Sequence, residues 1–79
     1  MRKVTLYTRV GCHLCDAVKL VLDEVCRETP FELELLDIDR DEALLALYNV
    51  EVPVVTIDGK KAFKYRMTAA QLRSRLARA

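Results

Sequence analysis

The chain has 79 residues, of which 52% are hydrophobic, and its formal net charge is +1. This length allows one domain, residues 1–79, with a modest core, and the hydrophobic content excludes a disordered chain. No apolar run approaches the roughly 18 residues of a membrane-spanning helix, and no signal peptide is expected. Three cysteines, an odd number, argue against a secreted disulfide framework. We therefore expect a cytoplasmic monomer without a membrane partner.

The charge is distributed unevenly along the chain. Residues 60–79 contain seven basic residues and no acidic one, whereas residues 1–59 contain six basic and twelve acidic residues. One interpretation is a basic surface for an acidic partner or a nucleic acid. The other is that arginines near the end of a last helix complement the dipole of that helix. We favour the second interpretation and expect no nucleic-acid partner.

The first strand and the first helix are predicted by the hydrophobic pattern. Residues 3–8 alternate, with Val4 and Leu6 on one face, which is typical of a strand. Residues 13–28 carry apolar side chains at helical spacing and charged side chains on the remaining surface. Cys26 falls on the apolar side of this helix, so we interpret it as a core residue.

A second strand and a short helix are predicted next. Residues 32–38 begin with glutamates that alternate with leucines, which favours a strand at a sheet edge. Asp39 is expected to cap a helix over residues 40–48. The apolar residues expected to be buried on this helix are Ala43, Leu44 and Leu47. Because a helix separates the first two strands, we expect them to be parallel and joined by a right-handed crossover.

The last third of the chain predicts a hairpin and a helix. Residues 54–57 and 60–65 flank Asp58-Gly59, a strong signal for a two-residue turn between antiparallel strands. Thr68 is expected to cap a last helix with Ala69, Leu72 and Leu76 facing inward. The order β-α-β-α-β-β-α predicts an α/β domain with a four-stranded mixed sheet between helices.

Cys12 and Cys15 lie where the first predicted strand passes into the first predicted helix. Two cysteines with this spacing at such a junction indicate a redox pair. Residues three apart are neighbours on a helix face, close enough for a disulfide. The helix N-terminus favours a thiolate, and Cys12 gains most because it lies first. We interpret Cys12 as the attacking thiolate and Cys15 as the resolving thiol, with protonated His13 adding a smaller attraction.

A metal site is the main alternative within one chain. Tetrahedral zinc takes four ligands, and a single C-x-x-C motif supplies two. Cys26 is eleven positions beyond Cys15 on the same predicted helix, roughly 16 Å along its axis at 1.5 Å per residue. We therefore expect no intrachain metal site and no cofactor. A structural role, in which both cysteines are only small apolar residues, is the other alternative.

The order of elements, the cysteine motif at Cys12 and Cys15, and Val52-Pro53 before the third predicted strand together resemble the thioredoxin superfamily. The size is most similar to that of small glutaredoxin-like proteins. The resemblance implies a thioredoxin-like fold, with Pro53 in cis beside the cysteines. It also implies that the backbone of Val52 pairs with a bound substrate as an added strand would. Arg9 matches a basic residue that glutaredoxins use near a carboxylate of glutathione; the other interpretation is an ordinary solvated arginine.

Two departures from the glutaredoxin pattern concern the substrate. His13 and Leu14 replace the usual Pro-Tyr between the cysteines, and we expect both to contact the substrate. Residues 63–68 contain neither the Gly-Gly pair nor the acidic residue that receive glutathione in that family. We therefore expect poor binding of glutathione, although it remains a candidate small-thiol substrate.

These observations predict a thiol–disulfide oxidoreductase that reduces protein disulfides and is itself reduced by an unknown reductase. Two functions of other classes stay open from the sequence. One is a module that binds an iron–sulfur cluster or a metal through the Cys12 thiolate, either from two chains or together with an external thiol. The other is an interaction domain whose cysteines never cycle.

Overall fold

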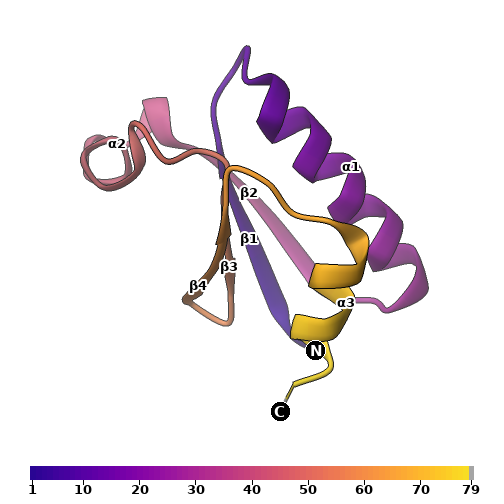
Figure 1. The fold of residues 1–79 in the computed structure, drawn as a ribbon. Coiled ribbons are helices and arrows are strands. Elements are labelled where there is room, and N and C mark those ends of the chain that lie inside the picture. Colours follow the sequence, from indigo (N-terminus) through magenta and orange to yellow (C-terminus); the bar gives the residue numbers. More distant parts are fainter. Residues whose placement is uncertain (79) are drawn as a thin grey trace.

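A computed structural model describes residues 1–78 as a four-stranded sheet in the order β2-β1-β3-β4 with helices on both sides (Figure 1). The strands are β1 Lys3–Thr8, β2 Glu32–Asp37, β3 Val54–Ile57 and β4 Lys60–Lys64; the helices are α1 His13–Glu28, the 3₁₀ turn η1 Ile38–Arg40, α2 Glu42–Tyr48 and α3 Ala69–Leu76. β1 pairs in parallel with β2 and antiparallel with β3, and β3 pairs antiparallel with β4. The predicted α/β fold with a mixed four-stranded sheet is confirmed.

The two faces of the sheet are covered differently. Figure 1 shows α1 and α3 together on one face and α2 on the other side. Val4 and Leu6 of β1 are buried on the first face, in a core that the apolar stripe of α1 and Leu72 of α3 complete. On the second face the rings of Tyr7 and Tyr48 lie 4.6 Å apart, which brings α2 against the end of β1. The hydrophobic core therefore lies almost entirely on the α1–α3 side.

The turn between β3 and β4 has the conformation that its sequence predicts. Asp58 and Gly59 both have positive φ, 51° and 85°, as a type I′ turn requires. The Asp58 carboxylate also accepts hydrogen bonds from the backbone N–H of Lys3 and from Arg2 Nε, at 3.0 and 2.9 Å. These contacts lower the pKa of Asp58 from its usual value and fasten the hairpin to the start of β1.

The start of the second helix differs from the prediction. Asp41, not Asp39, is the N-cap, and its carboxylate accepts hydrogen bonds from the N–H groups of Ala43 and Leu44. β2 ends at Asp37 rather than at 38, because Asp37 caps the turn η1 and Ile38 enters the core with no exposed surface. Three aspartates at alternate positions can each cap a helix, and the sequence pattern does not distinguish between them.

The buried stripe of the second helix is also different from the one expected. Leu44 and Leu45 are half-buried, whereas Ala43 is exposed and Leu47 is 62% exposed. The reason is that α2 contacts the sheet along the face that carries Tyr48, and this helix contains no fully buried residue. Packing of α2 therefore depends on polar and aromatic contacts more than on a hydrophobic stripe.

The last helix begins where the sequence predicts, and one of its basic residues forms an ion pair with α1. Thr68 caps α3 and forms a reciprocal capping box with Gln71. Arg73 of α3 binds Glu28 at the end of α1 through two hydrogen bonds of 2.8 Å. The ammonium of Lys61 lies 2.8 Å from a carboxylate oxygen of Glu51. The two oppositely charged parts of the chain thus meet each other within the domain.

Replacing Cys26 tests the packing of α1. Cys26 is half-buried against the core, and its thiol donates a hydrogen bond to the carbonyl of Phe31 at 3.3 Å. Cys26→Ala is expected to reduce the free energy of unfolding by about 1 kcal/mol, the usual size for a small truncation of this kind. Urea denaturation at pH 7 measures the difference. A loss above about 3 kcal/mol would mean that Cys26 is a central core residue.

Candidate functional site

Cys12 lies at the point where β1 turns into α1. Gly11, immediately before it, has a φ of +81°, a conformation that glycine adopts without strain. Cys12 is the N-cap of α1, and its Sγ accepts a hydrogen bond from the backbone N–H of Cys15 at 3.1 Å. The carbonyl of Cys12 accepts the N–H of Asp16 and so makes a normal first helical bond. The sulfur therefore occupies the position of an N-cap oxygen, where backbone N–H groups favour a negative charge.

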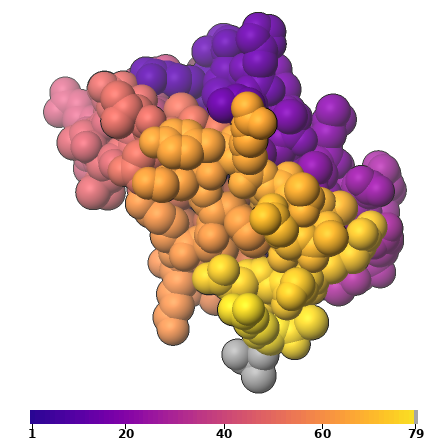
Figure 2. All heavy atoms as spheres, viewed as in Figure 1, coloured from indigo at the N-terminus to yellow at the C-terminus, as the bar shows by residue number. Residues whose placement is uncertain are grey.

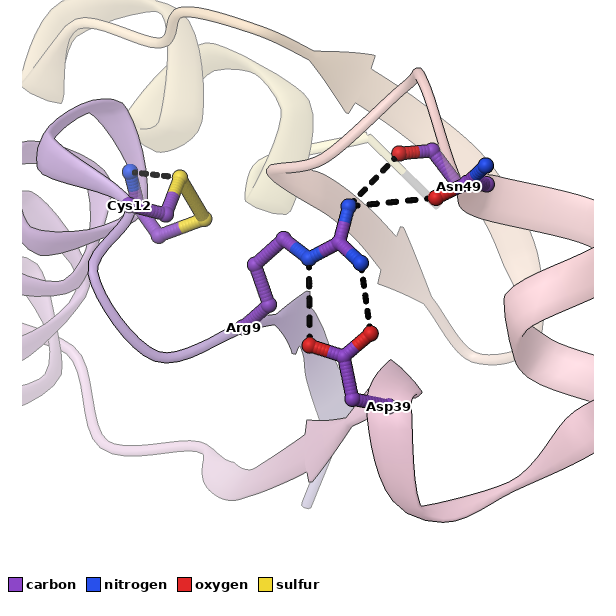
Figure 3. The surroundings of a disulfide bond; sticks show 5 residues. Arg9, Cys12, Asp39 and Asn49 are labelled. Atoms are coloured by element: carbon purple, nitrogen blue, oxygen red, sulfur yellow. Dashed lines mark hydrogen bonds and ion pairs between the residues drawn. A yellow bond between two sulfur atoms is a disulfide. The ribbon is translucent and has the colours of Figure 1, made fainter.

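Cys12 and Cys15 form a disulfide across the first turn of α1 (Figure 3). Their Cα atoms are 5.2 Å apart, within the range that a disulfide needs. The two sulfurs differ in access to solvent, because Cys12 is half-buried and Cys15 is only 1% exposed. An external disulfide can therefore meet Cys12 before it meets Cys15.

Arg9 follows β1 at the start of the cysteine loop and connects this loop to Asp39 of η1 and to Asn49 at the end of α2 (Figure 3). Its Nε and Nη2 atoms donate to the two carboxylate oxygens of Asp39 at 3.1 and 2.5 Å. Its Nη1 atom donates to the backbone carbonyl and the side-chain oxygen of Asn49, at 3.0 and 3.2 Å. We call this group of three residues the Arg9 clamp.

The clamp shifts the acid–base equilibria of both its charged members. The hydrogen bonds from Arg9 lower the pKa of the Asp39 carboxyl below its usual value. The same hydrogen bonds to Asp39 raise the pKa of Arg9. Both groups are therefore ionised at neutral pH, and the positive charge of Arg9 is matched within the clamp.

The Val52–Pro53 bond is cis, as the resemblance implied. Pro53 is fully buried, and its carbonyl accepts the N–H of Tyr65 at 2.8 Å. Val52 is half-buried, and within residues 1–78 its backbone N–H and carbonyl take part in no backbone hydrogen bond. These two groups are therefore available to an extended ligand.

A hollow of about 610 Å³ lies beside the disulfide, between α1 and the segment that leads into α3. It is lined by Leu14, Ala17, Val18, Val21, Tyr65, Arg66, Met67, Thr68 and Gln71. In the space-filling view the orange segment of the mid-sixties reaches the purple start of α1 (Figure 2). Leu14, which lies between the two cysteines, forms part of its wall, so the hollow adjoins the disulfide.

Tyr65 has an unusual backbone conformation at the rim of this hollow. Its φ is +69°, in the left-handed region that large side chains seldom adopt. The N–H bond to Pro53 and the turn closed by the N–H of Arg66 and the carbonyl of Lys64, each 2.8 Å, hold it there. Its ring is 42% exposed, and the Lys64 ammonium lies 5.4 Å from the ring centre. Residues 63–68, which contain no glycine, thus include a tyrosine in a conformation that glycine usually adopts.

The structure brings most of the predicted site residues to one end of the sheet. The residues at the cysteine loop are Arg9, Cys12, His13, Leu14 and Cys15, with His13 exposed at the first position of α1.

Within residues 1–78 no three His, Cys, Asp or Glu side chains group together as metal ligands do. The described helices include none long and apolar enough to cross a membrane.

Three residues of this region were missed by sequence reasoning. Asp39 was assigned as a helix cap, and Asn49 and the backbone of Tyr65 were not singled out. No local pattern signals the partners of Arg9, which lie 30 and 40 positions further along the chain. The positive φ of Tyr65 has no signal in the sequence, because large side chains seldom adopt this conformation.

The fold and the site define a class of protein: a thioredoxin-like domain with a disulfide at the start of its first helix. The chain belongs to the glutaredoxin-like domain family (DUF836), whose family model matches residues 3–77. It is similar to the protein Ne2328 from Nitrosomonas europaea, with 34% identity, a TM-score of 0.80, and 94% of this chain and 89% of that one covered.

Two further comparisons extend the similarity. The Mycobacterium tuberculosis protein Rv0508 is 31% identical over 81 residues, which cover 96% of this chain and 84% of that protein. A thioredoxin variant from Halobacterium salinarum has a TM-score of 0.70 at 19% identity, with 92% of this chain and 69% of that one covered. The last comparison supports the fold alone.

The Arg9 clamp predicts a pH-dependent contribution to stability. Because Arg9 lowers the pKa of Asp39, the pair stabilises the fold fully above the ordinary carboxyl pKa of 3.8 and loses this effect as pH falls through the lower folded value. Asp39→Asn is therefore expected to lower the urea midpoint at pH 7 and to have a smaller effect near a pH of about 3. Urea denaturation of both proteins at the two pH values measures this. Equal losses at both would contradict the assigned ionisation.

Proposed function

We propose that this chain is a thiol–disulfide oxidoreductase that acts on protein disulfides. The observation that carries the proposal is the position of Cys12: its sulfur is the accessible member of the pair and accepts a helix N–H bond. An N-cap sulfur that accepts N–H hydrogen bonds is more stable as a thiolate, the form that attacks disulfides.

The reaction begins from the reduced pair. The Cys12 thiolate attacks one sulfur of the substrate disulfide, and the other substrate sulfur leaves as a thiolate that takes a proton from water. Cys12 and the substrate are then joined in a mixed disulfide. The Cys15 thiol loses its proton and attacks the Cys12 sulfur, which releases the second substrate thiolate. The substrate has gained two electrons, and the Cys12–Cys15 disulfide has formed.

The substrate proposed here is an extended protein segment. The unpaired backbone groups of Val52 can form main-chain hydrogen bonds with such a segment. The hollow lined by Leu14 and Tyr65 can accept an apolar side chain next to the reacting sulfur. A reducing dithiol must return the pair to its starting state, so we infer the cytoplasm as its compartment.

Single cysteine variants test the two roles. Cys12→Ser is expected to abolish reduction of a protein disulfide, whereas Cys15→Ser is expected to accumulate a mixed disulfide on Cys12. Mass spectrometry after exposure to a small disulfide identifies the modified cysteine. Cys26→Ala is the matched control, and its turnover should stay within a few-fold of the parent because Cys26 lies at the far end of α1.

Two results would overturn this assignment. An adduct on Cys15 in the parent protein, together with an active Cys12→Ser variant, would reverse the roles. Visible absorbance that is lost on removing iron, combined with absent disulfide reduction, would favour the cluster-binding module instead.

Glutathione selectivity is the second test of the proposal. Residues 63–68 lack the Gly-Gly pair that receives glutathione in glutaredoxins, and the side chains of Phe63, Lys64 and Tyr65 crowd that approach, so reduction of protein disulfides should exceed deglutathionylation at equal enzyme. Tyr65→Gly removes the ring without opposing the positive φ. It is expected to raise the ratio of deglutathionylation to protein-disulfide reduction about tenfold, which corresponds to regaining one hydrogen bond to a charged group. Both rates are measured with purified protein and one common reductant.

Tyr65→Asn is the control, since asparagine also tolerates a left-handed conformation but keeps a side chain at this position. Its rate ratio should remain near that of the parent protein. Saturable micromolar binding of glutathione to the parent would show instead that the loop does not exclude this ligand.

A further inference from the structure

We infer that Arg9 is a positioning residue, which holds the substrate-binding segment at Val52 in place and does not itself bind a carboxylate of the substrate. This inference rests on the function proposed above. It differs from what the resemblance to glutaredoxins implies for this position, and it follows from the contacts of the Arg9 clamp.

The donors of Arg9 are almost all occupied within the protein. A guanidinium has five N–H groups, and Arg9 makes four hydrogen bonds with Asp39 and Asn49. The two bonds to Asp39 form the bidentate geometry in which arginine and a carboxylate bind most strongly. A substrate carboxylate could take only a single bond to the remaining N–H, and a bidentate contact would have to displace Asp39 or Asn49, of which Asp39 supplies the same chemistry at higher local concentration.

The clamp joins the cysteine loop to the segment that precedes Pro53. Arg9 is three positions before Cys12 in the sequence, and its partner Asn49 is three positions before Val52. The bond to the Asn49 carbonyl fixes the backbone itself, at the residue where α2 ends. Because α2 contains no fully buried residue, the hydrophobic core does not hold this segment by itself. The fully buried Pro53 holds Val52 on the β3 side, and the clamp holds it on the α2 side, so both together set the distance between the Cys12 sulfur and the free backbone groups of Val52.

The clamp is not expected to act through the charge of Arg9 on the Cys12 thiolate. Asp39 lies between 2.5 and 3.1 Å from the guanidinium and offsets most of its field. A positioning role and a charge effect can thus be separated, since only the charge effect would change the reactivity of Cys12 toward a small reagent.

Two conservative variants distinguish positioning from direct binding. Arg9→Lys keeps the positive charge but cannot form the fork, and Asp39→Asn frees the charge of Arg9 and weakens the fork. Positioning predicts that both raise KM for a protein disulfide about fivefold or more, with kcat changed by less than about twofold. Direct binding predicts a different result for Asp39→Asn, which would lower KM because it frees Arg9 for the substrate; Arg9→Lys raises KM in either case, so Asp39→Asn is the variant that separates the two roles.

The reactivity of Cys12 supplies the second readout. The rate of alkylation of reduced Cys12 by iodoacetamide, measured against pH in the Cys26→Ala background, should be unchanged within about twofold in both variants. A rise in this rate at low pH in Asp39→Asn alone would overturn positioning in favour of a charge effect, because that variant frees the charge of Arg9 and a positive charge favours the thiolate. Unchanged KM in both variants would overturn it as well.

A matched control exists at the other end of α1. Arg73 binds Glu28 with the same bidentate geometry, at 2.8 and 2.8 Å, and joins α3 to α1 far from the cysteines. Arg73→Lys and Glu28→Gln should reduce stability in a similar way and leave KM within about twofold of the parent. A KM rise in these variants equal to that of Arg9→Lys would mean that loss of stability alone explains the effect.

Failure of this inference is distinct from failure of the proposed function. The parent protein is assayed first with a protein disulfide and a dithiol reductant. Absent turnover there overturns the proposed function. Normal turnover with KM unaffected by Arg9→Lys and Asp39→Asn overturns only the role of the clamp.

Discussion

The first N–H groups of α1 have no carbonyl acceptors within the helix, and the sulfur of Cys12 accepts one of them. This contact places the Cys12 sulfur at a point that the hydrophobic core determines. β1 runs between β2 and β3, and α1 packs its buried stripe of Val18, Leu22 and Val25 across the sheet. The end of the strand and the start of the helix can therefore move little relative to each other. The Cys12–Cys15 disulfide thus lies at a junction whose two sides both carry buried residues.

The opposite wall of the site is held by different forces. α2 contributes the stacked ring of Tyr48, and the segment after it is tied by the Arg9–Asn49 bonds and by Glu51, which pairs with Lys61. Polar contacts of this kind are exposed, and each contributes little alone. Together they fix direction and distance rather than add much stability. The cysteine loop is thus held between buried elements, whereas the segment before Pro53 is positioned by one stacked ring and exposed polar contacts.

The parts of the fold that follow from local chemistry could be predicted from the sequence. β1, α1, the Asp58-Gly59 turn and the Thr68 cap all lie where alternation, helical spacing and capping rules indicate. The prediction for α2 was wrong about its N-cap and its buried face. Three aspartates can each serve as the cap, and the packing of this helix is largely polar. The partners of Arg9 could not be predicted, since contacts between residues 30 or 40 positions apart leave no local pattern. The positive φ of Tyr65 is set by its bond to Pro53, which only the folded chain supplies.

The two outer strands of the sheet carry opposite charges. β2 carries Glu32 and Glu34, and β4 carries Lys60, Lys61 and Lys64. An open strand edge is a template on which a second copy of the chain can add its own strand. Two β2 edges repel each other, and so do two β4 edges, so symmetric edge-to-edge pairing of two copies is disfavoured. The uneven distribution of charge along the sequence, mapped onto the sheet, thereby disfavours symmetric pairing of two copies through either edge, whereas it does not oppose contact between a β2 edge and a β4 edge.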